Sequence, residues 1–224
     1  MTPSSTSSPS PAEGTAARTR GAQTRAAVLA CGALAVDIHA IARRRDWSVD
    51  VHPLPALLHN RPERIAPAIG EALAGLRSRY DVIAVAYGDC GSYGAIDALL
   101  SGGDVHRLAA ENCYELFARE EVRAALQEEP GTYFLTDFLA RTFEHTVVRE
   151  LGLDRHPELR DMYFGNYMRI VWLAQRPTPA TRAAAERAAA RVGLPLCEVH
   201  VGTGELEREL ERLLSPAAGA PDRM

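Results

Sequence analysis

The chain repeats one pattern that limits its fold: a short apolar run, a turn, and then a segment with helical spacing. The pattern is clearest in "DVIAVAYGDC", an almost uninterrupted apolar run that ends at a Gly-Asp-Cys turn. Such a run is typical of a strand buried on both faces, as in a parallel sheet. The runs "RAAVLACGAL", "MRIVWLAQ" and "LPLCEVHVG" have the same character, and each precedes a helical pattern. The sequence therefore predicts an α/β fold with a mainly parallel, Rossmann-like sheet and helices on both faces.

The organisation that we predict is a single α/β domain over residues 26–214, with a tail at each end. Residues 1–25 and 215–224 are rich in Ser, Pro, Ala and Gly, and we expect both to be disordered. Within the domain, residues 111–168 show mostly helical spacing, including one long helix over 132–152. We therefore expect a helical insertion that lies over the carboxyl ends of the strands.

The composition excludes several classes of protein. The net charge is −4, all 25 Lys or Arg residues are arginine, and no basic block occurs, so we expect no nucleic-acid partner. The absence of lysine excludes P-loop and Schiff-base chemistry. No apolar run reaches the roughly 20 residues that a membrane span needs, and the N-terminus has no hydrophobic signal segment. We expect a cytoplasmic protein with reduced cysteines and no membrane partner.

Three of the four cysteines fall where the chain passes from a strand or loop into a helix. Cys31 and Cys90 end predicted strands and are followed by Gly32 and Gly91, and Cys113 stands near the start of another helix. Ligands of parallel sheets gather at the carboxyl ends of the strands. Backbone N–H groups at such turns, including those of the two glycines, can contact a bound cofactor and lower the pKa of a thiol. We therefore expect the three thiols to hold one metal centre.

Three thiolates with one open position match two kinds of centre. One is a zinc ion that binds and activates a substrate, such as another thiol, at its fourth position. The other is a 4Fe-4S cluster with one iron that no protein cysteine binds. The sequence leaves both open, because zinc fits the sulfur ligands and needs no redox partner, whereas the cluster fits three cysteines drawn from separate turns. No CxxC pair is present, so the spacing of the cysteines alone does not indicate a metal site. A cysteine can also serve as a small apolar filler, and we assign that role to Cys197, which lies within a predicted strand.

Other polar residues near these turns are candidates for catalysis and binding. His59 precedes a helix and could act as a base or a ligand, and Arg61 beside it could pair with an anionic substrate group. Asp89 adjoins Cys90 and could orient a metal ligand. Asp137 lies early in a long helix among apolar residues, where a carboxylate is either a helix-start charge or a buried acid that points into the cleft.

Seven segments occur in an order that is similar to a known family. They are "ACGAL", "LPALLHNRPERI", "YGDCGSYG", "ENCYELF", "EPGTYFLTDFLAR", "LGLDRHPELRDMYFGNY" and "LAQ". From about residue 27 to residue 214, the chain resembles the bacterial and archaeal family catalogued as domain of unknown function 1638. Position 112 is asparagine, where relatives are expected to carry histidine. If that histidine is a fourth metal ligand in relatives, this chain lacks it, and its metal site would consist of three cysteines and one open coordination position. The resemblance falls on Cys31, His59, Asn60, Arg61, Asp89, Cys90, Cys113, Tyr114, Glu115, Thr136 and Asp137.

The resemblance implies a role in one-carbon transfer, because such proteins are associated with genes for corrinoid-dependent methyltransferases. Our leading hypothesis is a metal-dependent enzyme that moves a methyl group, with a methyl donor or thiol as substrate and a corrinoid protein as a possible partner. His59, Asp89 and Asp137 would take catalytic roles, and Arg61 and Tyr114 would contact the bound group. Two alternatives stay open: an iron–sulfur protein in redox or substrate activation, and a non-enzymatic module that binds a corrinoid protein or delivers metal to it.

Overall fold

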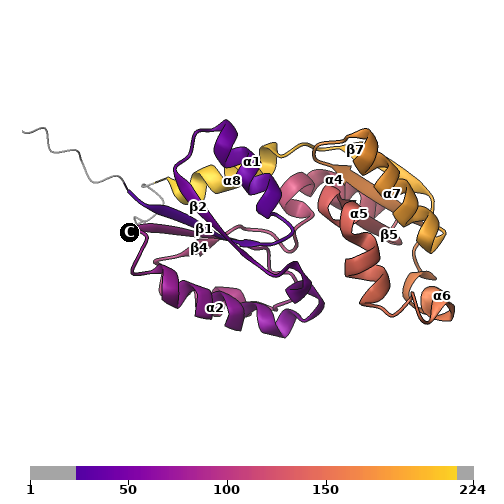
Figure 1. Cartoon of the computed structure of the whole chain (residues 1–224), viewed down its shortest axis with the longest axis horizontal. Coiled ribbons are helices and arrows are strands. Elements are labelled where there is room, and N and C mark those ends of the chain that lie inside the picture. Colours follow the sequence, from indigo (N-terminus) through magenta and orange to yellow (C-terminus); the bar gives the residue numbers. More distant parts are fainter. Residues whose placement is uncertain (1–23, 216–224) are drawn as a thin grey trace, which may run out of the picture.

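The computed structural model describes residues 24–215, which form two α/β lobes (Figure 1). Lobe 1 comprises residues 24–114 and 204–215, and lobe 2 comprises residues 115–203. The predicted tails lie outside the described residues, except for residues 24, 25 and 215. All strand pairs in both lobes are parallel, so the predicted α/β class with parallel sheets is confirmed.

Lobe 1 contains a four-stranded sheet in the order β2-β1-β3-β4. In Figure 1, α2 lies on one side of this sheet, and α1 and α8 lie on the other. From β1 the chain turns to one side to form β2 and then crosses to the other side to form β3, so the ends of β1 and β3 flank a topological switch point. The strands and helices of lobe 1 are β1 (Ala26–Cys31), α1 (Ala35–Arg44), β2 (Val49–Leu54), two 3-10 turns (Ala56–Asn60 and Pro62–Arg64), α2 (Ile65–Leu76), β3 (Val82–Ala86), α3 (Ala95–Leu99), β4 (His106–Arg107) and α8 (Gly204–Leu214).

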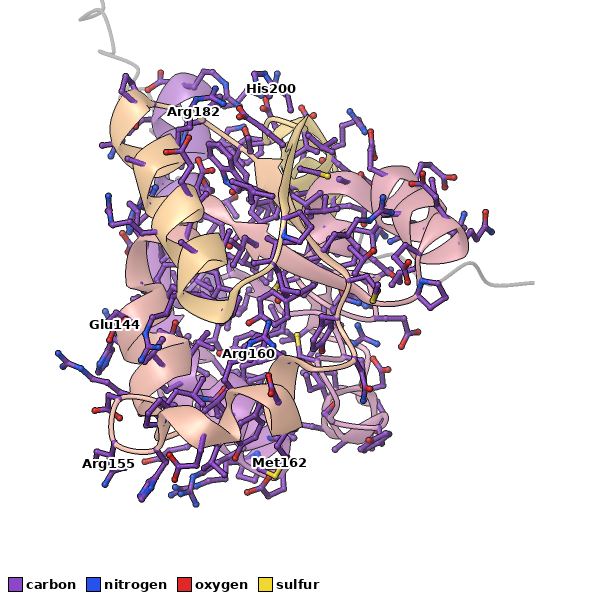
Figure 2. All side chains as sticks on the ribbon, turned by 90° about the vertical axis from the view of Figure 1, so that its right-hand side faces the viewer. Glu144, Arg155, Arg160, Met162, Arg182 and His200 are labelled. Atoms are coloured by element: carbon purple, nitrogen blue, oxygen red, sulfur yellow. The ribbon has the colours of Figure 1, made fainter. Side chains whose placement is uncertain are left out.

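Lobe 2 contains a three-stranded sheet in the order β5-β6-β7. Its elements are α4 (Glu115–Glu128), β5 (Thr132–Thr136), α5 (Asp137–Phe143), a π-helical segment (Glu144–Arg149), a 3-10 turn (Pro157–Leu159), α6 (Arg160–Phe164), β6 (Arg169–Ala174), α7 (Pro179–Val192) and β7 (Leu196–His200). In the view onto this lobe, Arg182 and His200 lie at one end, where both pair with Glu198, and Arg155 and Met162 lie at the other (Figure 2).

The side chains of β6 explain how the two lobes pack together. Ile170, Trp172 and Ala174 face a core that α5 and α7 help to form, whereas Val171 and Leu173 belong to the core of lobe 1. This alternation follows from the two-residue period of a strand. Strand β6 is therefore buried on both faces, and one of these faces joins the core of the other lobe.

Specific residues mark the start and the end of α7. The Thr178 hydroxyl accepts a hydrogen bond from the backbone N–H of Thr181 at 3.1 Å, and the Thr181 hydroxyl accepts one from the N–H of Thr178 at 2.7 Å. This reciprocal cap satisfies two N–H groups that a helix start would otherwise leave free. Gly193 ends the helix with a φ of +71°, which glycine adopts at low cost.

Three predictions about the architecture are wrong. Two sheets are present where we predicted one, and the long helix predicted over 132–152 is wrong at its start, because 132–136 form β5. The helix at Asp137 begins directly after β5 with no turn between them, so the apolar residues of both elements merge into one apparent period. Cys197 does not fill the core; it is exposed on β7, an edge strand with β6 as its neighbour.

Among residues 24–215, no helix is both long and apolar enough to cross a bilayer.

Candidate functional site

A cavity of about 400 Å³ lies between the lobes, at the carboxyl ends of β1 and β3. Its lobe 1 side includes Cys31, Cys90 and Cys113, the three cysteines that the sequence analysis selected. A site at this position agrees with the rule that parallel sheets bind ligands at their switch points. The structure therefore brings the three thiols to one pocket.

Cys31 is the last residue of β1, and its side chain is almost fully buried. Backbone groups of Ala33 and Leu34, in the turn that leads into α1, lower the pKa of its thiol and so oppose the larger effect of burial. Gly32 permits a close approach of this turn to the end of β2, since its N–H donates to the Leu54 carbonyl at 2.9 Å. A Cβ at position 32 would lie only 2.7 Å from that oxygen, so a larger residue would displace the turn. Gly32 thus shapes the site through its backbone.

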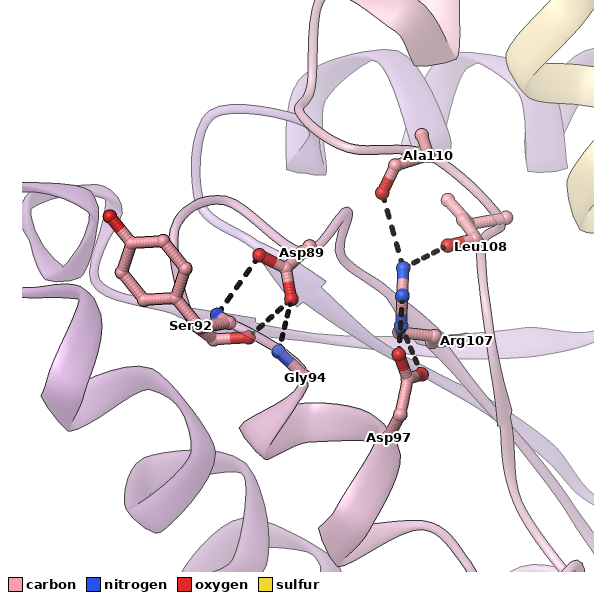
Figure 3. Close-up of polar contacts among 8 residues, drawn as sticks. Asp89, Ser92, Gly94, Asp97, Arg107, Leu108 and Ala110 are labelled. Atoms are coloured by element: carbon pink, nitrogen blue, oxygen red, sulfur yellow. Dashed lines mark hydrogen bonds and ion pairs between the residues drawn. The ribbon is translucent and has the colours of Figure 1, made fainter.

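Cys90 lies in a tight loop in which several residues have left-handed backbone angles. Its φ is +51°, that of Tyr93 is +51°, and that of Gly91 is +80°. The Asp89 carboxylate holds this loop, because it accepts hydrogen bonds from the Ser92 hydroxyl at 2.8 Å and from the N–H groups of Tyr93 and Gly94 at 3.1 and 2.9 Å (Figure 3). These bonds lower the pKa of Asp89, with that from Gly94 contributing most. The predicted neighbour of Cys90 therefore fixes the cysteine loop, and it does not line the pocket.

Cys113 is brought to Cys90 by pairing between two loops. The N–H groups of Asp89 and Cys90 donate to the carbonyls of Ala110 and Glu111 at 2.8 and 2.7 Å. Gly88 allows this contact, because a Cβ there would lie 3.0 Å from the backbone of Asn112. The Asn112 side chain then caps the turn into α4, accepting from the N–H groups of residues 114 and 115 at 3.1 and 3.2 Å. Asn112 therefore caps the start of α4.

Arg107 supports the second of these loops from behind (Figure 3). Its guanidinium makes two hydrogen bonds to the Asp97 carboxylate, at 2.6 and 2.7 Å, and donates to the carbonyls of Leu108 and Ala110 at 2.9 and 3.2 Å. Ala110 therefore accepts from both Arg107 and Asp89, so one carbonyl ties the two loops together. The sequence does not reveal the role of Arg107, since a single arginine on a short strand carries no distinguishing pattern.

The thiols have raised pKa values, which contradicts the expectation that helix starts would lower them. Burial is the main cause for all three, and it raises the pKa of Cys90 to about 12. Each cysteine also interacts with at least one other group of the set: Cys31 raises the pKa of Cys90, and both raise that of Cys113. The thiols are therefore protonated at neutral pH in the absence of a cation.

Tyr87 adds a polar group without a hydrogen-bond partner to the side of the pocket that carries the three cysteines. Its side chain is 2% exposed, and its hydroxyl finds no partner with hydrogen-bond geometry among residues 24–215. Burial raises its pKa, and the neighbouring Cys31 raises it further. A buried hydroxyl without a partner is costly, so this group is available to a ligand or to an ionised sulfur. Its place at the end of an apolar run, three residues before Cys90, is a signal that the sequence analysis overlooked.

Of the other predicted residues, some line the pocket and some do not. His59 and Asn60 line the pocket; His59 is exposed on one side, while burial of its ring lowers its pKa. Tyr114 also lines the pocket and packs on Phe134, with ring centroids 5.5 Å apart. Arg61 is exposed and does not line the pocket.

Asp137 lies behind the pocket wall. Its side chain is 2% exposed, and its carboxylate accepts from the Trp172 indole at 2.9 Å and from the N–H of Arg176 at 2.8 Å. Its own N–H donates to the Gln175 amide oxygen at 2.7 Å. These bonds join the start of α5 to the end of β6. Asp137 is therefore a fully bonded buried acid, and it does not line the cavity.

Comparison with protein families decides the relationship of the chain. A family model described as "Protein of unknown function (DUF1638)" matches residues 53–210. The chain belongs to this family. No curated protein and no solved structure matches it. The matched part contains Cys90 and Cys113, whereas Cys31 precedes it on the central strand β1.

The donor set of this family member suits a soft metal ion. Cysteine thiolates prefer such ions, and the Tyr87 hydroxyl beside Cys31 could donate to a thiolate sulfur. As the side chains stand, no three His, Cys, Asp or Glu residues in the described part of the chain are arranged to hold a metal ion. The three cysteine sulfurs would therefore have to come closer together than they are here to bind one metal ion.

Proposed function

We propose that the chain is a metal-dependent enzyme in which Cys31, Cys90 and Cys113 bind one zinc ion. The observation that carries this proposal is the presence of three thiols from three separate turns in one pocket, at the switch point of a parallel sheet. The unpartnered hydroxyl of Tyr87 on the same wall supports it. A purely structural role for three cysteines would not require a cavity beside them.

The electrostatics favour a cation in this pocket. Burial keeps the thiols protonated, so three thiolates would form only with a positive charge among them. Backbone groups of Ala33 and Leu34 already lower the pKa of the Cys31 thiol, and those of Gly88 and Cys113 lower the pKa of the Cys90 thiol. These groups, together with Tyr87, would stabilise the sulfurs once they are ionised.

The reaction that we assign to the pocket is the transfer of a methyl group, as the family resemblance implies. Bound zinc would supply a Lewis acid that lowers the pKa of a substrate thiol at its open position. His59 and Asn60 would orient the substrate at the pocket rim. The walls of the cavity would exclude water from the reacting group. A corrinoid protein remains our proposed partner, as donor or acceptor of the methyl group.

Metal analysis of the purified full chain tests the proposal. We expect about one zinc ion per chain in aerobic and anaerobic preparations alike. The variants Cys31→Ser, Cys90→Ser and Cys113→Ser should each lose it. Cys197→Ser is the matched control, because Cys197 is exposed on β7 and far from the pocket lining, and it should keep full occupancy.

Other outcomes of the same measurement separate the alternatives. If anaerobic protein contains iron and sulfide and has a visible absorption that bleaches in air, the metal centre is an iron–sulfur cluster and not a zinc ion. A substoichiometric amount of every metal in both preparations would refute the metal centre. Capture of a corrinoid protein by the zinc-loaded chain, with no methyl turnover, would favour a delivery module over an enzyme.

A further inference from the structure

We infer that the lobe 2 half of the pocket binds a small uncharged molecule that presents a flat apolar group, such as an aromatic ring. This inference deepens the proposed function and rests on it in one respect: the bound molecule would be the substrate of the metal centre. Its binding can nevertheless be measured in metal-free protein, so the two ideas can fail separately.

The lobe 2 wall is built from large apolar and aromatic side chains. They come from β5, the start of α5, the π-helical segment and the loop before β6, and they include Tyr133, Phe138, Leu139, Val147, Leu151 and Tyr167. The rings of Tyr133 and Tyr167 meet edge to face, with centroids 5.2 Å apart and planes at 88°. Flat aromatic ligands pack well against such rings. A cavity of about 400 Å³ is also large enough for a small organic molecule.

The cavity offers no charge to a ligand. None of the described residues that line it is Asp, Glu, Lys or Arg. The charged groups behind the wall are occupied: Asp137 binds Trp172 and Arg176, and Arg169 binds Glu128 at 2.9 Å and the Thr132 hydroxyl at 3.0 Å. An ionic ligand would lose its hydration without gaining a counter-charge. The pocket therefore favours a neutral molecule over a charged one of the same shape.

Neutral hydrogen-bonding groups are present in the same wall. Tyr133 and Tyr167 carry hydroxyls, and burial raises the pKa of Tyr133, so its hydroxyl stays protonated across the physiological range. Thr146 also lines the cavity and lies in the π-helical segment, a rare backbone form that occurs often at functional sites. A ligand with one hydroxyl, ether or carbonyl group could bond to these residues without carrying charge.

Three ligands that share a ring and differ in charge test the inference. Benzyl alcohol, benzoate and benzylamine are compared by isothermal titration with the metal-free full chain at pH 7. We expect benzyl alcohol to bind about tenfold or more tightly than either ion, because neither ion finds a counter-charge. Equal or tighter binding of benzoate or benzylamine overturns the inference, and so does the absence of binding by all three.

Two variants locate the binding. Thr146→Asp places a carboxylate in the half-buried wall and should reverse the preference in favour of benzylamine, whereas His145→Asp, on the exposed neighbouring position, should not. Leu151→Trp fills part of the cavity and should abolish binding of benzyl alcohol while zinc stoichiometry is unchanged. Unchanged ligand preference in Thr146→Asp and unchanged affinity in Leu151→Trp would place the ligand elsewhere and refute the inference.

Discussion

At the scale of single residues, Tyr87 is the most informative side chain in the pocket. It is buried beside two of the cysteines, yet its hydroxyl has no hydrogen-bond partner among the described residues. Natural proteins rarely leave such a group unsatisfied. The hydroxyl is therefore expected to matter more in the metal-loaded protein than in the metal-free fold.

The variant Tyr87→Phe separates these two states. Removing an unsatisfied hydroxyl should leave the metal-free protein unchanged or stabilise it by up to about 1–3 kcal/mol. Zinc affinity should fall by roughly tenfold or more, since a group that supports the metal ligands is lost. Urea denaturation and competition with a zinc chelator measure the two effects. Loss of stability in the metal-free protein with unchanged zinc affinity would show that the hydroxyl serves the fold alone.

The raised thiol pKa values predict a loss of stability in alkali. The pKa of Cys90 is about 12 in the folded protein against an ordinary value of 9.0, so the folded state holds its proton where the unfolded state has released it. Stability of the metal-free protein should therefore fall as pH rises from about 9 to about 12. Cys90→Ser should reduce the slope, while Cys197→Ser should not. Urea midpoints of reduced protein across this range give the slope for each variant.

At the scale of elements, the site depends on two loops that hold each other in place. Asp89 fixes the loop with Cys90, and Arg107 fixes the loop that leads to Cys113. Both loops meet at the Ala110 carbonyl. The positions of Cys90 and Cys113 are therefore set by polar contacts of β4 and the loops, whereas Cys31 is placed by the end of β1.

The variant Arg107→Ala tests this support. Loss of the guanidinium leaves the Asp97 carboxylate and the Leu108 and Ala110 carbonyls without their donor, at a cost of about 1–3 kcal/mol. Cys113 should then react faster with an alkylating reagent, measured by mass spectrometry, and zinc affinity should fall.

Two further variants serve as controls for Arg107. Arg107→Lys keeps the positive charge but lacks the planar guanidinium group. Its Cys113 alkylation rate should therefore lie between those of the natural protein and Arg107→Ala. Arg123→Ala removes an exposed pair with Glu120 on α4 and should change neither rate nor affinity. An unchanged rate at Cys113 in Arg107→Ala would contradict the supporting role.

The comparison between sequence and structure is clearest at this scale. Apolar runs located β1, β3, β6 and β7, because each is separated from the next helix by a turn. They did not locate β5, which passes into α5 at Asp137 with no separating turn. Nor could they assign strands to two sheets, since strands of both sheets have the same local pattern. Cys31 and Cys90 were predicted from their positions at strand ends and Cys113 from its place near a helix start, whereas Arg107 and Tyr87 required the tertiary contacts.

At the scale of the whole molecule, an ion pair between a buried acid and a partly exposed arginine joins the two lobes. Asp37 on α1 is 3% exposed, and Arg176, just after β6, lies 2.9 Å from its carboxylate. Burial raises the pKa of Asp37, and Arg176 opposes that rise. The neighbouring Asp137 raises it further, and Arg141 opposes this rise as well. Arg176 thus provides the main counter-charge for an acid that the packing of the lobes has enclosed.

The variant Arg176→Ala should be strongly destabilising near neutral pH. It leaves Asp37 buried without its main partner, at a cost of about 2–3 kcal/mol, less than for a fully buried pair because the Arg176 side chain is 44% exposed. The pKa of Asp37 should rise further, so the loss should shrink as pH falls toward its ordinary value of 3.8. Adding Asp37→Asn should restore much of the stability at pH 7, as urea denaturation would show. A pH-independent loss, or no recovery in the double variant, would assign the effect to another cause.

The path of the chain between the lobes has a consequence for how such proteins can diversify. Lobe 2 is one unbroken stretch, residues 115–203, and the N–H of Arg119 bonds the Glu205 carboxylate at 3.1 Å, so its two ends lie together. All three thiols belong to lobe 1, and the aromatic wall belongs to lobe 2. A single recombination between related genes could therefore replace the entire stretch, exchanging the specificity of the pocket while inheriting its sulfur ligands intact.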